Sequence, residues 1–161
     1  MMRIKKTMMA FAPIFMAAVI LTGCGGSKKA DVTVDVQKVA DELNKTVTSE
    51  QLTSVTNDMI ASNFAISKDD YTDGAAYMSS GATACEVAVI ECKDEDAAAS
   101  VEKVFEQRKS DRTDLFASYN EGEVSKLDSA VLETAGKYVA WCVTDDADAA
   151  KKVLDEYGFK K

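Results

Sequence analysis

A pattern that occurs twice, 52 residues apart, constrains the fold of this chain more than any other feature. In each copy, a run of apolar residues (85–90, then 138–144) is followed by aspartates and then by apolar residues at helical spacing. Such runs predict strands, and an aspartate at the start of a helix can cap free amides and oppose the helix dipole. The pattern therefore predicts two strand–helix units, with a long helix after Asp94, a second helix at 146–157, and Gly158 as the cap of the second helix.

The remaining secondary structure follows from apolar periodicity and from turn residues. Apolar residues at helical spacing predict a helix at 35–47, and Gly136 between two apolar runs predicts a hairpin of strands 130–134 and 138–144. The other expectations are a short turn of helix at 49–52, a helix at 57–65 and a loop at 67–81. Together these elements predict an α+β domain, in which a small, mostly antiparallel sheet packs against a long helix and shorter helices on one face.

The first 23 residues are expected to form a helical signal peptide that is cleaved from the mature chain. They combine three basic residues with an apolar run at 7–21, which is shorter than the roughly 20 residues that a membrane-spanning helix needs. The run ends in Leu21-Thr22-Gly23-Cys24, which resembles the lipobox of bacterial lipoproteins. The resemblance implies that Cys24 receives a lipid group and becomes the first residue of the mature chain.

These features divide the chain into three parts. Residues 1–23 are the lipoprotein signal peptide, residues 24–31 are a flexible tether, and residues 32–161 form a single α+β domain. Two or three acyl chains on one cysteine give lasting attachment to a bilayer, whereas a single chain binds only weakly. The expected location is therefore the extracytoplasmic face of the cell membrane, with the membrane as a partner through the lipid anchor.

Charge and composition exclude several functions. Without Arg3, Lys5 and Lys6, the chain keeps 16 basic and 27 acidic residues, which gives a net charge of −11. This charge disfavours a nucleic-acid partner, because binding to phosphate backbones depends on Lys and Arg. The chain contains no histidine, which excludes Ser–His and Cys–His catalytic pairs and histidine metal sites. The sequence therefore predicts no catalytic, cofactor-binding or metal-binding residues.

The expected function is a noncatalytic binding or scaffolding domain, whose ligand is a protein or a small molecule. The alternative is a surface hydrolase that uses carboxylates alone, as glycosidases use two acids that flank the cleaved bond. Glu86, Glu91 and Glu133, on the predicted strands, are the candidate acids for that alternative.

Arg108 and Arg112 are the most distinctive polar residues of the predicted long helix. They are the only arginines after the signal peptide, and they lie four residues apart on the continuation of its apolar stripe. One interpretation is structural: their stems cover the core, and their guanidinium groups pair with acids such as Glu106 or Asp111. The other is a small anion site, because two planar guanidinium groups on one helix face suit a carboxylate or a phosphate.

Three cysteines remain once Cys24 carries lipid. Cys85 and Cys92 lie in one predicted strand, roughly 23 Å apart at about 3.3 Å per residue, which is too far for a disulfide. Any bridge would therefore include Cys142. The sequence leaves open whether Cys142 forms a disulfide with Cys85 or Cys92, or whether all three are unpaired side chains in the core.

Several of these features together resemble a known family. They are the lipobox, an N-terminal helix, the strand at 85–90, the long helix that carries Arg108, and the hairpin around Gly136-Lys137-Tyr138-Val139. This combination resembles the lipoproteins grouped as domain of unknown function 4358. The resemblance implies a bacterial surface lipoprotein of unknown molecular activity, and it implies no catalytic residues.

Overall fold

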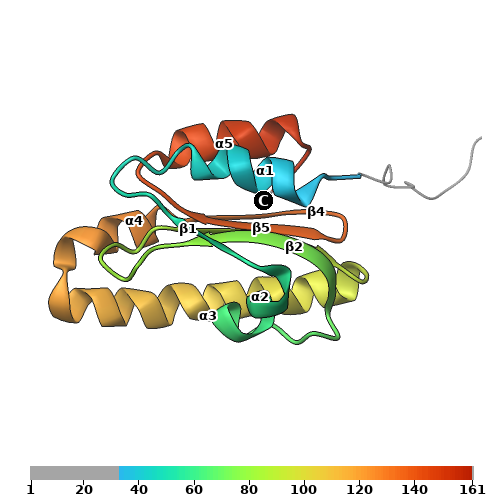
Figure 1. Ribbon diagram of the computed structural model, residues 1–161, viewed down its shortest axis with the longest axis horizontal. Coiled ribbons are helices and arrows are strands. Elements are labelled where there is room, and N and C mark those ends of the chain that lie inside the picture. The colour runs from blue at the N-terminus through green and yellow to red at the C-terminus, as the bar shows by residue number, and fades with distance from the viewer. Residues whose placement is uncertain (1–32, 161) are drawn as a thin grey trace, which may run out of the picture.

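The computed structural model describes residues 33–160, so the expected signal peptide, Cys24 and the tether lie outside the described residues. The sheet is antiparallel and has the strand order β1-β2-β3-β5-β4 (Figure 1). Its strands are β1 (Thr53–Val55), β2 (Tyr71–Met78), β3 (Glu86–Cys92), β4 (Val131–Ala135) and β5 (Tyr138–Val143). The helices are α1 (Val36–Asn44), α2 (Asn57–Phe64), α3 (Glu95–Tyr119), α4 (Val124–Asp128) and α5 (Ala147–Glu156), with a 3-10 turn at Glu121–Glu123. The predicted α+β class, with an antiparallel sheet packed against one long helix and shorter helices, is confirmed.

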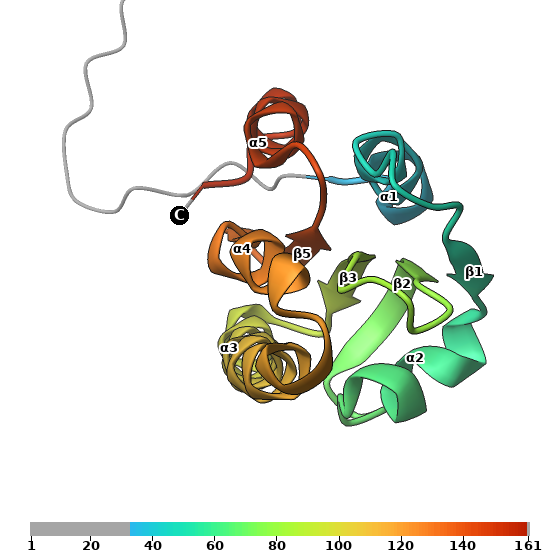
Figure 2. The ribbon, with the colours of Figure 1, turned by 90° about the vertical axis from the view of Figure 1, so that its left-hand side faces the viewer.

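Helices cover both faces of the sheet, and the expectation of one covered face is wrong (Figures 1 and 2). α1 and α5 lie on one face, and α2 and α3 lie on the other. Val87 and Ala140 belong to the core cluster on the α1 and α5 side, whereas Ala88 and Trp141 belong to the cluster on the α3 side. The central strands β3 and β5 are therefore buried on both faces. Their nearly continuous apolar runs, in place of alternation, are the sequence signal of such strands.

Both predicted strand–helix units are confirmed. The side chain of Asp94 accepts a 2.8 Å hydrogen bond from the amide of Ala97 at the start of α3, and Asp146 accepts a 2.9 Å bond from Ala149 at the start of α5. Gly158 follows α5 with a φ of 81°, which suits glycine. The strands of the two units, β3 and β5, are neighbours in the sheet. The repeated pattern thus forms the centre of the fold. The helix of the first unit, α3, and the helix of the second unit, α5, lie on opposite faces of the sheet (Figures 1 and 2).

The prediction of a loop at 67–81 is wrong, because most of that segment forms β2. Residues such as Asp73 and Gly74 are typical of loops. Here, however, a Cβ atom on Gly74 would lie 2.8 Å from Cδ1 of Ile60 in α2. A small residue is therefore needed in this strand to let α2 pack closely against the sheet. The turn of helix expected at 49–52 is also wrong, since those residues lead into β1 without helical structure.

No helix among residues 33–160 combines the length and the apolar character that crossing a membrane requires.

Candidate functional site

A carboxylate is buried in the sheet beside both arginines of α3. Glu86, the first residue of β3, is fully buried. Its Oε1 accepts hydrogen bonds from Nε of Arg108 at 2.6 Å and from Nε1 of Trp141 at 2.7 Å. Its Oε2 accepts a bond from Nη2 of Arg108 at 2.8 Å and lies 3.6 Å from Nε of Arg112. Arg108 therefore binds the carboxylate at two points, the geometry that its planar fork favours.

The guanidinium groups have further partners that fix their positions. Arg108 lies over the ring of Phe64, 4.7 Å from its centroid, and Arg112 lies 5.3 Å from the ring centroid of Phe116. Arg108 also donates a hydrogen bond to the main-chain carbonyl group of Asn63, and Arg112 donates one to that of Ala84. Both arginines therefore cover the core and pair with an acid, as the structural interpretation expects. The acid comes from the sheet, however, and not from α3 itself.

A pocket of about 320 Å³ adjoins the two arginines between α2 and α3. Arg108, Arg112 and Asp111 line this pocket together with apolar side chains. The two negative charges of Glu86 and Asp111 balance the two positive charges of the arginines, so the four side chains together carry no net positive charge. The small anion site at Arg108 and Arg112 stays a prediction, and a carboxylate of the protein itself already contacts both guanidinium groups.

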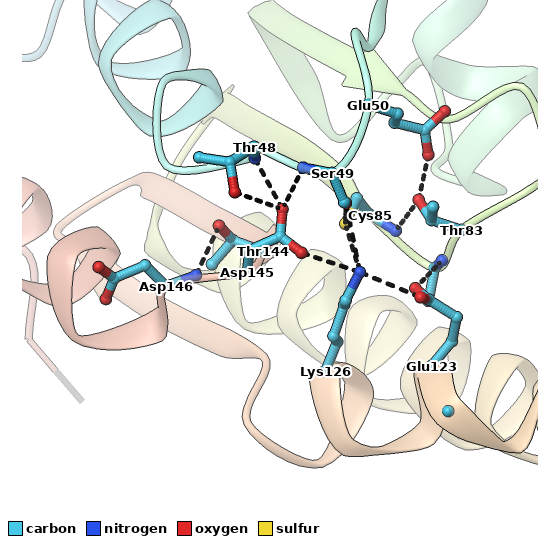
Figure 3. Close-up of polar contacts among 12 residues, drawn as sticks. Thr48, Ser49, Glu50, Thr83, Cys85, Glu123, Lys126, Thr144, Asp145 and Asp146 are labelled. Carbon is cyan, nitrogen blue, oxygen red and sulfur yellow. Dashed lines mark hydrogen bonds and ion pairs between the residues drawn. The ribbon is translucent and has the colours of Figure 1, made fainter.

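A second polar cluster lies where β3 begins and β5 ends, and Lys126 of α4 is at its centre (Figure 3). Nζ of Lys126 lies 2.8 Å from Oδ1 of Asp145 and 3.0 Å from Oε1 of Glu123. The same amine is 3.3 Å from the hydroxyl of Ser49 and 3.8 Å from the sulfur of Cys85. An amine beside a hydroxyl and a thiol is an arrangement in which a lysine could activate a nucleophile.

The electrostatics of this cluster oppose such chemistry. Partial burial alone would lower the pKa of Lys126, but its bonds to Asp145 and Glu123 outweigh burial and raise that pKa above its ordinary value. Burial is also the main reason that the pKa of Cys85 is raised. Near neutral pH, the amine is therefore protonated and the thiol is neutral. A protonated amine cannot accept a proton, and a neutral thiol is a poor nucleophile.

The cluster joins segments that are distant in sequence. Oδ2 of Asp145 accepts bonds from the main-chain amides of Thr48 and Ser49, at 2.7 and 2.8 Å. Oε2 of Glu123 accepts a 2.9 Å bond from the amide of Ala84. The cluster therefore ties the segment before β1, the start of β3, α4 and the end of β5 together. Apolar periodicity did not identify it, because α4 is short and its charged residues look like those of any exposed turn.

A family model described as Domain of unknown function (DUF4358) matches residues 45–144, which is more than half of the chain. The chain belongs to the DUF4358 family. In this DUF4358 chain, the matched span contains all five strands of the described sheet, together with Glu86, Arg108, Arg112 and Lys126. No curated protein and no solved structure matches the chain.

The three cysteines of the described DUF4358 domain are buried and unbridged. Cys85, Cys92 and Cys142 are all free. Burial raises the pKa of both Cys92 and Cys142 to about 12. Of the alternatives left open by the sequence, unpaired core side chains are therefore the one observed.

The three strand glutamates considered for a hydrolase lie in different surroundings. Glu86 is bound by Arg108 and Trp141, and Glu91 lies 2.6 Å from Nζ of Lys137. Glu133 borders a cavity between α3 and β4. Within the described part of the chain, no three Cys, Asp or Glu side chains are grouped so that they could hold a metal ion.

Proposed function

We propose that this DUF4358 protein is a lipoprotein held through Cys24 at the extracytoplasmic face of the cell membrane. The observation that carries the proposal is the lipobox Leu21-Thr22-Gly23-Cys24, placed directly after a basic start and an apolar run. Cleavage after Gly23 makes Cys24 the N-terminal residue, and residues 24–31 then connect the lipid to the folded domain.

The physical chemistry of the segment supports this arrangement. Each methylene of a buried acyl chain contributes about 0.8 kcal/mol, so several chains hold the protein durably. The tether contains Lys28 and Lys29, whose charges attract anionic headgroups. Fully extended, the eight residues from 24 to 31 span at most roughly 28 Å. The net charge of −11 after cleavage keeps the domain itself away from anionic lipid.

We further propose that the domain binds a protein or a small-molecule ligand and performs no catalysis. The polar groups that resemble catalytic residues are already engaged within the fold, which supports this proposal. The amine of Lys126 is paired with two carboxylates, the thiol of Cys85 is buried, and Glu86 accepts bonds from Arg108 and Trp141. The acidic charge likewise disfavours a nucleic-acid partner.

Metabolic labelling tests the anchor. Bacteria that express the full chain are grown with radiolabelled palmitate, and the purified protein is examined on a gel. We expect label in the wild-type protein and in a Ser27→Ala control, and none in Cys24→Ala, because the sulfur of Cys24 is the first site of acylation. Equal labelling of Cys24→Ala would contradict the assignment of that residue.

Activity assays test the noncatalytic proposal. Purified protein is incubated with panels of ester, peptide and glycan substrates, beside a heat-denatured sample as control. We expect no difference between the two samples. Hydrolysis by the native sample alone would favour the carboxylate hydrolase, and unchanged hydrolysis by a variant with Glu86→Gln, Glu91→Gln and Glu133→Gln would rule that alternative out.

A further inference from the structure

The edge of the sheet at β4 is open to an additional strand. β4 is the last strand in the order, so β5 is its only neighbouring strand in the described sheet. Part of the open edge is already paired: Thr134 and Lys160 exchange two main-chain hydrogen bonds, of 3.1 and 3.0 Å. The fold therefore shows that this edge accepts an extended segment in antiparallel pairing.

The main-chain groups of Leu132, two residues before Thr134, point in the same direction as those of Thr134. Because both main-chain groups of Thr134 bond to Lys160, they point away from β5. Main-chain groups alternate in direction along a strand, so the N–H and C=O of Leu132 also point outward. No hydrogen bond joins either group of Leu132 to another described residue outside the sheet ladder. One donor and one acceptor are therefore available for pairing.

A cavity of about 370 Å³ lies beside this position. Val131, Leu132 and Glu133 of β4 line it, together with residues of α3, with Lys151 of α5 and with the buried Trp141. Figure 1 shows β4 between the helix layer that contains α5 and the layer that contains α3. The cavity therefore forms a groove along the strand edge with helices at its walls, the arrangement in which peptides add to a sheet.

The charged residues that line the groove indicate the charge of its ligand. Its lining contains four carboxylates and two amines, from Glu102, Glu106, Asp128, Glu133, Lys109 and Lys151. One of the amines, Nζ of Lys109, donates a 3.0 Å bond to the carbonyl of Asp128. The acidic excess favours a ligand with positively charged side chains.

We propose that the groove at β4 binds an extended, basic segment of a partner protein, which pairs with the main chain of Leu132 and places Lys or Arg side chains beside the carboxylates of α3. This inference rests on the proposed binding function of the domain, and it names the kind of partner. It does not depend on Cys24, so failure of the peptide test and failure of palmitate labelling are distinguishable.

Titration of the isotope-labelled full chain in detergent with designed peptides tests the proposal. The probe is a pool of capped heptapeptides in which Lys alternates with Val or Thr, followed by nuclear magnetic resonance of the main-chain amides. We expect saturable shifts at Leu132 and none at Ser54 of β1, on the opposite edge of the sheet. A pool with Glu in place of Lys should not bind. Absence of a saturable shift at Leu132 with the Lys pool would overturn the proposal.

Methylation of the three central amide nitrogens of the peptide separates strand pairing from simple charge attraction. We expect the methylated pool to bind about tenfold more weakly, because the main-chain bonds are lost. This comparison changes the ligand and leaves the protein intact, so no variant needs to fold. Equal affinity of the methylated and unmethylated pools would overturn strand addition.

A matched pair of variants tests the role of the carboxylates. Glu102→Gln with Glu106→Gln removes two charges from the groove, and Asp111→Asn with Asp114→Asn removes two charges from α3 outside it. We expect the first variant to bind the Lys pool about fivefold more weakly and the second to change affinity by less than about twofold. Equal losses in the two variants would assign binding to the net charge of the protein and overturn the groove.

Discussion

At the scale of single residues, the most consequential interaction is the ion pair between Glu86 and Arg108. Removing one partner of a buried pair leaves an uncompensated charge, which destabilises a protein strongly. Glu86 is fully buried, and Arg108 supplies two of its three hydrogen bonds. One of the two interpretations from the sequence placed Arg108 over the core, but it named acids of α3 as partners, because pairing between a helix and a strand depends on tertiary packing.

We therefore expect Arg108→Ala to lower the free energy of unfolding by about 3 kcal/mol, as measured by urea denaturation. Lys103→Ala, at an exposed position of the same helix, is the control and should change it by less than about 0.5 kcal/mol. Similar small effects of both substitutions would show that the buried pair does not stabilise the domain.

The second residue-scale prediction concerns Asp145 and the pH dependence of stability. Burial would raise the pKa of Asp145, but bonds from Lys126 and from the amides of Thr48 and Ser49 lower it well below its ordinary value of 3.8. The folded state therefore binds this proton less readily than the unfolded state. Its stabilising contribution is fully present above about pH 4 and is lost as the pH falls below that value.

Asp145→Asn should consequently flatten the fall in unfolding free energy between pH 5 and pH 3, by an amount on the order of 1 kcal/mol. Asp155→Asn provides the control, since Asp155 is exposed and its side chain forms no hydrogen bond or ion pair with another of residues 33–160. If the Asp145→Asn curve kept the wild-type slope, the Lys126 cluster would not act as described.

At the scale of elements, the sequence predicted the parts whose signals are local. The caps Asp94 and Asp146 and the apolar spacing after them define α3 and α5, and Gly136 defines the hairpin of β4 and β5. β2 was missed because its Asp and Gly residues are typical of loops. The small residue Gly74 is needed for packing against α2, and this packing has no signal in the sequence of the strand. The second helix layer was missed for a similar reason: apolar runs show that a strand is buried, but not which helices cover it.

The close approach of α2 to β2 gives an element-scale prediction. Gly74→Ala places a methyl group against Cδ1 of Ile60, so we expect a loss of about 1 kcal/mol of unfolding free energy. The loss should shrink in an Ile60→Val background, because valine lacks that atom. Gly122→Ala is the control, since the nearest atom there is 3.6 Å away. An equal loss in both backgrounds, measured by a double-mutant cycle, would show that this contact does not set the packing distance.

At the scale of the whole molecule, the described domain is a sheet between two helix layers (Figure 2). Glu86 is buried between the layers, and β4 forms one edge of the sheet. The sequence predicted the α+β class and gave the lipobox, whereas the groove depends on the meeting of α3, β4 and α5 and has no local signal. On the account proposed here, the lipid fixes where the domain works, and the exposed edge recognises a partner.

The intact mass of protein extracted from its native membrane is the decisive measurement for the proposed lipid anchor. We expect a chain that begins at Cys24, lacks residues 1–23, and carries the added mass of a diacylglyceryl group. A chain that retains Met1 and has no added hydrocarbon would contradict it.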